Sequence, residues 1–253
     1  MPVIKGFVII VPNSSTDYEL NRINAIDLTL SDAGWPFAVE NAAAIAEHWA
    51  GCTRDNPALF NGNVFLMSSG GLEGSRLTAE LIEVDYASFL TWRDWGWPDK
   101  TAHDLYGSAI VLSSDGAMLV GRMSPHTVNA GLLYPPGGSL NRDDLLAGNK
   151  VDLFGSIARE LAEETGLDAA EAEAGEVYMA SFDQRIAIGQ VLRFPHDAAE
   201  LVRKFSIFLE SEPDPELEQI LMIRNVAELA GHKKPPHAEA FASAVLGSAT
   251  ADA

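Results

Sequence analysis

The chain has 253 residues, of which 36 are acidic and 17 are basic, and it carries a net charge of −19. The acid excess argues against a nucleic-acid partner, because a phosphate backbone needs a basic surface. No apolar run reaches the length of about 18 residues that a bilayer-spanning helix needs, so no membrane partner is predicted either. The single cysteine, Cys52, excludes an internal disulfide and predicts a cytoplasmic location.

The predicted elements fall into two parts and a tail. Residues 1–101 are expected to form a small α+β domain, with strands at 3–11, 64–67 and 78–86 and helices at 37–51 and 86–95. Residues 102–236 are expected to form a second domain, with strands at 106–113, 117–123, 175–182, 185–194 and 219–224 and a helix at 197–209. The Ala/Ser-rich residues 237–253 are expected to form a terminal helix or to fray.

Residues 159–167, Arg-Glu-Leu-Ala-Glu-Glu-Thr-Gly-Leu, predict a functional helix. At helical spacing, Glu160, Glu163 and Glu164 share one face. A different face is apolar, and its predicted members are Phe154, Ile157, Ala158 and Leu161. Gly166 is placed to end the helix in the left-handed conformation. Three carboxylates on a fixed helix offer ligands to a hard ion such as Mg²⁺, although an Ala/Glu-rich chain also produces solvated acidic helices by chance.

The segment Tyr134-Pro135-Pro136-Gly137-Gly138 precedes this helix and follows two predicted strands joined by a turn at 113–116. This order resembles the Nudix hydrolase family, whose motif is a glycine, five residues, a glutamate, seven residues, and then Arg-Glu-apolar-x-Glu-Glu-x-Gly-apolar. The second half is matched at every fixed position by Arg159, Glu160, Leu161, Glu163, Glu164, Gly166 and Leu167. The resemblance implies an α/β fold, with an α/β/α sandwich around a mixed sheet behind the small α+β domain.

The first half of the motif differs. Val151 stands eight residues before Arg159, where the family usually has its first glutamate, and the span from Gly138 to Arg159 is about seven residues longer than the motif. Asp152, or Asp143 or Asp144 in the longer segment, is a candidate for the missing oxygen ligand. The alternative is that the position is lost and the site has three glutamates.

The resemblance implies hydrolysis of a nucleoside diphosphate linked to another moiety. Mg²⁺, or Mn²⁺, would be held by Glu160, Glu163 and Glu164, with Glu160 as an alternative acceptor for the proton of the attacking water. Arg159 is expected to orient the acidic cluster. Gly137 and Gly138 would let the backbone approach the phosphates, or would form only a tight turn. Candidates for phosphate contacts, each of which could equally be a surface charge, are Arg122, Arg142, Lys150 and Arg185.

A further resemblance concerns the substrate. Residues 56–66, preceded by a helix with Trp49, resemble the N-terminal domain of the animal Nudix enzymes that cleave UDP-glucose and UDP-galactose. A UDP-sugar, cleaved to UMP and a sugar 1-phosphate, is therefore the expected substrate. The alternatives are ADP-ribose, an ADP-sugar or a dinucleotide, and, from another class, a non-catalytic nucleotide sensor. Additional candidates are two late acids and a tryptophan cluster that could stack a nucleobase or pack a core: Glu216, Glu218, Trp92, Trp95 and Trp97. No oligomeric state is predicted.

Overall fold

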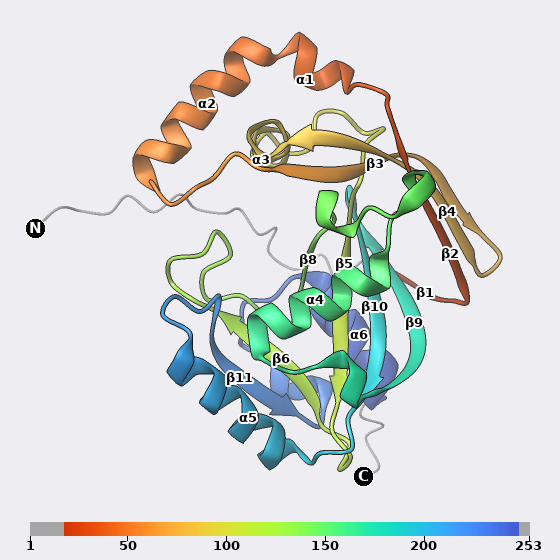
Figure 1. Ribbon diagram of the computed structural model, residues 1–253, viewed down its shortest axis with the longest axis vertical. Helices are drawn as coiled ribbons and strands as arrows, with labels where there is room; N and C mark the ends of the chain where they lie inside the picture. The colour runs from red at the N-terminus through yellow and green to blue at the C-terminus, as the bar shows by residue number, and fades with distance from the viewer. Residues whose placement is uncertain (1–17, 248–253) are drawn as a thin grey trace, which may run out of the picture.

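The computed structural model describes residues 18–247, so the predicted strand at 3–11 and the end of the tail lie outside the described residues (Figure 1). Its largest element is an eight-stranded sheet. The main strand order is β1 (Glu19–Ile23), β9 (Glu173–Phe182), β10 (Arg185–Arg193), β5 (Asp104–Leu112), β6 (Met118–Met123) and β11 (Leu217–Ile223). Two short strands join it, β7 (Leu133–Tyr134) on β6 and β8 (Gly137–Ser139) on β5. Because β10 and β5 run parallel and the other pairs are antiparallel, the sheet is mixed.

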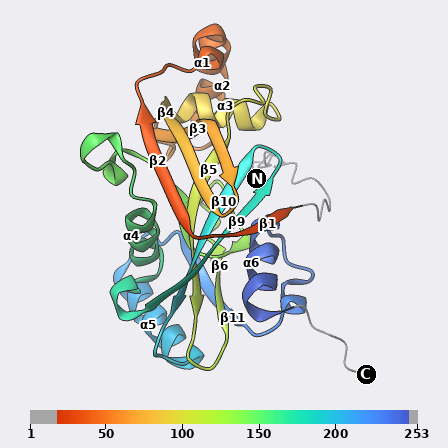
Figure 2. The ribbon, with the colours of Figure 1, turned by 90° about the vertical axis from the view of Figure 1, so that its right-hand side faces the viewer.

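Helices cover both faces of this sheet (Figure 2). On one face, α4 (Leu153–Thr165) and α5 (Ala198–Ser211) bury Ile157 and Phe205 in one apolar cluster with Leu105 of β5. On the other face, α6 (Pro236–Leu246) buries Phe241 against Ile110. The predicted α/β/α sandwich with a mixed sheet is therefore confirmed, and the first part of the predicted tail is helical. Among residues 18–247, no helix is long and apolar enough to cross a membrane.

A second, three-stranded sheet lies above the first in Figure 1, in the order β2 (Ala25–Ser31), β4 (Arg76–Asp85) and β3 (Asn63–Glu73). Its helices are α1 (Pro36–Glu40), α2 (Ala42–Asp55) and α3 (Tyr86–Asp94). Trp92 is fully buried among these elements and meets Trp97 edge to face at 4.4 Å, whereas Trp95 is exposed. Two of the three predicted tryptophans thus belong to a packed aromatic core.

The two sheets share a chain crossing and a core. Only Asn24 separates β1, which pairs with β9 in the large sheet, from β2, which pairs with β4 in the small one. The apolar cluster beneath α4 also contains Leu28 and Phe65 from the small sheet. The boundary predicted at residue 101 stays a prediction, and β1 is a contribution of the N-terminal part to the large sheet that sequence patterns did not indicate.

The long segment between β8 and α4 is fastened to the small sheet at both ends. The Phe65 amide donates to the carbonyl of Leu140 at 2.8 Å, and the Val151 amide donates to the carbonyl of Leu28 at 3.1 Å. Two ion pairs reinforce this contact, Arg142 with Glu83, and Lys150 with Asp27 at 2.6 Å. The segment therefore connects the small sheet to the start of α4.

Candidate active site

The helix α4 has defined ends and one buried face. The Asp152 carboxylate accepts a hydrogen bond from the Gly155 amide at 2.9 Å, which caps the first turn, and Gly166 ends the helix with φ 71° in the left-handed region, as predicted. Leu153, Ile157 and Leu161 are buried, whereas Phe154 is exposed, so the assignment of Phe154 to the apolar stripe was wrong. Asp152 acts as a helix cap, which gives no support to its candidacy as a metal ligand.

The three predicted carboxylates of α4 differ in exposure. The Glu163 side chain is 60% exposed, that of Glu160 is 16% exposed, and Glu164 is buried. The Glu164 carboxylate accepts a hydrogen bond from the Gly137 amide of β8 at 3.1 Å. The acidic face therefore runs from solvent at Glu163 to the interior at Glu164, alongside β8.

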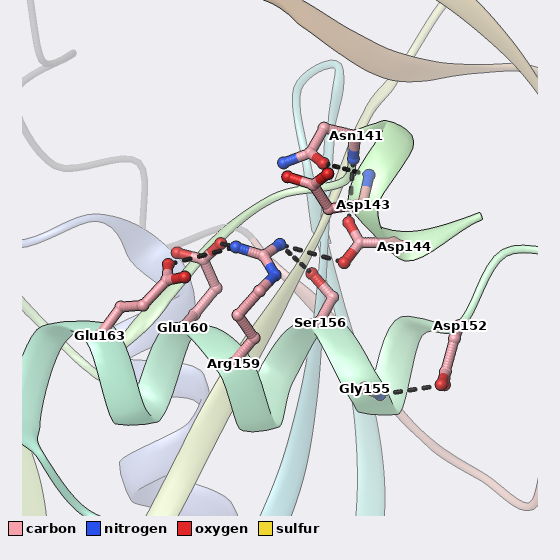
Figure 3. A network of polar contacts seen from close by, with 9 residues as sticks. All are labelled: Asn141, Asp143, Asp144, Asp152, Gly155, Ser156, Arg159, Glu160 and Glu163. Carbon is pink, nitrogen blue, oxygen red and sulfur yellow. Dashed lines mark hydrogen bonds and ion pairs between the residues drawn. The ribbon is translucent and has the colours of Figure 1, made fainter.

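Arg159 lies between two sets of acids (Figure 3). One guanidinium nitrogen, Nη1, donates to Glu160 at 2.8 Å and to Glu163 at 3.2 Å. The other, Nη2, donates to Asp144 at 3.0 Å. A planar guanidinium that bonds three carboxylates restricts their relative positions, and the orienting role of Arg159 stays a prediction.

Of the residues considered for the first acidic position of the motif, Asp144 is the one that contacts Arg159. Its side chain is 2% exposed and also accepts from the Asn141 amide at 2.9 Å. Val151 instead packs into the core beside the small sheet, where a glutamate would be buried among apolar groups. Counting forward from Gly138, five residues precede Asp144, as the motif requires, so the seven extra residues lie between Asp144 and Arg159. Counting back from Arg159 gave Val151, so Asp144 was left as one of three candidates. The neighbouring Asp143 is exposed.

The two glycines of the motif are strand residues rather than a turn, since β8 pairs with β5 at Gly137–Ser108 and Gly138–Gly107. A Cβ at Gly137 would lie 2.1 Å from the carbonyl oxygen of Gly107. A Cβ at Gly138 would lie 2.4 Å from Oε2 of Glu160. The first glycine therefore permits strand pairing, and the second leaves room for the Glu160 carboxylate.

Burial and like charges perturb the acids of this site. Burial, opposed by Arg159 and reinforced by Glu163, raises the pKa of Glu160 to about 7. The pKa of Glu164 is raised well above its usual value by burial and then by Glu216 and Glu160. Partial desolvation, with Glu163, also raises the pKa of Glu216, although this residue is exposed at the surface. Glu216, in the loop before β11, thus lies within electrostatic reach of all three glutamates of α4 and belongs to the acidic cluster.

The donor set of this cluster fits a hard divalent cation, because it offers only carboxylate oxygens. Their pKa values are raised first by burial and then by neighbouring acids, and a bound cation would offset both effects by favouring the charged form. Within residues 18–247, the oxygens of these acids do not gather within 4.8 Å of one another. Arg159 holds two of the carboxylates, those of Glu160 and Glu163. Glu160, Glu163, Glu164 and Glu216 are the residues that could hold an ion here.

The predicted phosphate-binding cations lie in other contacts. Arg142 and Lys150 pair with acids of the small sheet, as described above. Arg185 stacks over Phe182 at 4.4 Å and pairs with Asp183. Arg122 of β6 lies 3.9 Å from Glu218, the second of the two late acids. None of these contacts involves the acidic cluster itself, and the phosphate-binding roles stay predictions.

No protein-family model matches the chain, and no curated protein matches it in sequence. Among solved structures, it is similar to a MutT protein from Methanosarcina mazei Go1, with 21% identity over 55% of this chain and 89% of that one and a TM-score of 0.38. A Nudix hydrolase from Nitrosomonas europaea is 14% identical over 55% and 85% of the two chains, with a TM-score of 0.37. A protein from Deinococcus radiodurans is 15% identical over 71% and 96%, with a TM-score of 0.42. Similarities at this level carry no functional argument, and the proposal below depends on the residues of the site.

Proposed function

We propose that the protein is a divalent-metal-dependent hydrolase that cleaves the phosphoanhydride bond of a nucleoside diphosphate linked to another moiety. The observation that carries this proposal is the network of Arg159 with Glu160, Glu163 and Asp144, set beside the buried Glu164. A folded chain gains nothing in stability from burying like charges together, so such a cluster is a candidate for function.

The residues of the cluster have separate proposed roles. Glu160, Glu163 and Glu164, with Glu216 as a fourth carboxylate, would hold Mg²⁺ or Mn²⁺. When bound, such an ion would polarise the phosphoryl oxygens and ease negative charge onto the leaving phosphate. Glu160, whose pKa is raised to about 7, is suited to accept the proton of the attacking water at neutral pH.

Two residues would act by position. Arg159 would keep the acids of α4 in place, and Asp144 would anchor Arg159 from the segment that contacts the small sheet. Neither needs to touch the substrate. Asp144 is therefore proposed as a positioning residue and not as a replacement metal ligand.

A UDP-sugar remains the proposed substrate, with UMP and a sugar 1-phosphate as products, and the resemblance of residues 56–66 supports this choice. A reducing, cytoplasmic location agrees with the single cysteine. ADP-ribose, ADP-sugars and dinucleotides are the competing substrates.

The test is a phosphate-release screen of the purified full chain with a coupled phosphatase. The panel contains UDP-glucose, UDP-galactose, ADP-ribose, ADP-glucose, NADH and nucleoside triphosphates, with Mg²⁺ or Mn²⁺. We expect metal-dependent cleavage of the UDP-sugars. Preference for an adenine nucleotide would overturn the choice of a UDP-sugar as substrate. Nucleotide binding without turnover would favour the alternative of a non-catalytic nucleotide sensor.

The variant Glu164→Gln distinguishes an effect on catalysis from an effect on the stability of the fold. The amide keeps the volume and removes a buried charge that Glu216 and Glu160 oppose, so turnover should fall at least about 100-fold while the thermal midpoint stays equal or rises. Glu210→Gln, which removes the same charge from the exposed surface of α5, is the matched control and should change neither. Wild-type turnover in Glu164→Gln would refute the assigned site.

A further inference from the structure

A second group of potential metal ligands lies in the N-terminal part, on α2 and α3. His48 and Cys52 are four residues apart on α2 and therefore share one face, and Asp94 ends α3 opposite them. Cys52 Sγ lies 3.4 Å from His48 Nε2, which lies 3.0 Å from Asp94 Oδ2. Among residues 18–247, these three supply ligand atoms that all lie within 4.8 Å of one another.

The geometry differs from that of a catalytic relay. In a Cys-His-Asp relay, the thiol and the carboxylate bond to different imidazole nitrogens. Here both approach the same nitrogen, Nε2 of His48. Sγ and Oδ2 thus gather around one imidazole nitrogen rather than lying at the two ends of a chain, and three ligand atoms this close together are compatible with a single cation.

The spacing agrees with tetrahedral coordination. With Zn–S of about 2.3 Å and Zn–N and Zn–O of about 2.0–2.1 Å, tetrahedral ligands lie about 3.4–3.6 Å apart. The two observed separations, 3.4 and 3.0 Å, are close to that, and the third, from Cys52 Sγ to Asp94 Oδ2, is within 4.8 Å. Oδ1 of Asp94 is held by Arg93 at 3.1 and 3.2 Å, which leaves Oδ2 turned toward His48. Such outer contacts orient metal ligands in proteins.

The donor types select the ion. A thiolate and an imidazole favour zinc and related transition metals over Mg²⁺, which prefers oxygen alone. The His48 and Asp94 side chains are 20% and 28% exposed, so an ion can reach the group from solvent.

A metal ion would also stabilise the position of α2. Of its 14 residues, only Ile45 is buried, so apolar packing ties it weakly to the rest of the chain. An ion between α2 and α3 would replace two hydrogen-bonded contacts, of which only that of His48 with Asp94 joins the two helices, with a cross-link.

We propose that Cys52, His48 and Asp94 form a Zn²⁺ site that joins α2 to α3, with the fourth position open to water. The site is separate from the acidic cluster of α4, and its existence does not depend on the proposed hydrolysis.

The single cysteine makes the site testable by Co²⁺ titration of the full chain after dialysis against a chelator. Thiolate-bound Co²⁺ gives a near-ultraviolet charge-transfer band that oxygen ligands do not give. We expect this band to saturate at one equivalent, to vanish when Zn²⁺ is added, and to be absent from Cys52→Ser. His48→Gln and Asp94→Asn should each weaken Co²⁺ binding by about tenfold or more. Zn²⁺ should also raise the thermal midpoint of the wild type by more than that of Cys52→Ser, in which only the acidic cluster could still bind the ion.

Glu164→Gln is the matched control, because it removes a ligand from the acidic cluster and should leave the band intact. Circular dichroism of each variant verifies that it is folded. Absence of the band from the wild type would overturn the proposal. So would a band of unchanged affinity in folded His48→Gln and Asp94→Asn, since the thiol would then be binding the ion without the other two ligands.

Discussion

Gly138→Ala tests how closely the acidic cluster is fitted to β8. The added Cβ would lie 2.4 Å from Oε2 and 2.6 Å from Cδ of Glu160, whereas ordinary contacts begin at 3.4 Å. The Glu160 carboxylate would therefore have to retreat by about 1 Å, because the backbone of β8 is held by its pairing with β5. Since the displaced atoms end a flexible side chain, the fold should lose no more than about 1 kcal/mol in free energy of unfolding.

The catalytic cost should be much larger. A misplacement of about 1 Å can lower a rate about 100-fold, which corresponds to about 2.7 kcal/mol of transition-state stabilisation. We expect kcat/KM for the best substrate of the screen to fall by this factor and Mn²⁺, followed by its electron paramagnetic resonance signal, to bind more weakly. Urea unfolding measures the stability in parallel.

Gly71→Ala is the control, because it adds the same methyl group in a strand where nothing lies within 4 Å of the new Cβ. It should leave kcat/KM and Mn²⁺ binding unchanged. The reasoning is refuted if Gly138→Ala stays within twofold of the wild type in both measurements, or if it loses several kcal/mol of stability, since the side chain of Glu160 would then not have absorbed the clash.

Two further predictions concern buried charge. Asp144→Asn should lower kcat/KM and reduce the free energy of unfolding in urea by about 2 kcal/mol, because the buried partner of Arg159 loses its charge. Asp143→Asn, at the exposed neighbour, should change the free energy of unfolding by no more than about 0.5 kcal/mol, and equal losses in the two variants would contradict the role assigned to Asp144. Burial, with Arg185, lowers the pKa of His237 from 6.5 to about 3, so the unfolded chain takes up this proton first and stability falls as the pH drops below 6.5. His237 contributes up to about 1.4 kcal/mol per pH unit to the fall in the free energy of unfolding, and His237→Gln should remove this contribution between about pH 6 and 4. If the pH dependence of stability is unchanged in the variant, other groups cause the acid sensitivity.

Local patterns predicted the elements around the site well. The hairpin of β5 and β6, the helix α4 and its end at Gly166 all follow from short-range signals, namely turn residues, apolar spacing and a glycine in the left-handed region. The α/β/α arrangement followed from a resemblance carried by the same residues. These features are encoded within a few turns or strands of chain, and the sequence is sufficient for them.

Features that depend on distant contacts were not predicted. The strand β1 is short and polar, and it is a strand because β9, more than 150 residues later, supplies its hydrogen-bond partners. The long segment before α4 is held by the small sheet through Leu28 and Phe65, which is why counting along the sequence left Asp144 as one option among three. Glu216 was a candidate from the sequence, but its approach to the glutamates of α4 depends on tertiary folding.

Because only Asn24 separates β1 from β2, the two sheets are expected to evolve as one unit. A fragment beginning at residue 102 would leave β9 as an open edge with unpaired amides, and it would release the segment that carries Asp144. Recombination or gene fusion at that boundary should therefore produce a misfolding product, not a smaller enzyme. The two sheets are expected to have been transmitted together, with substitutions in one constrained by the other.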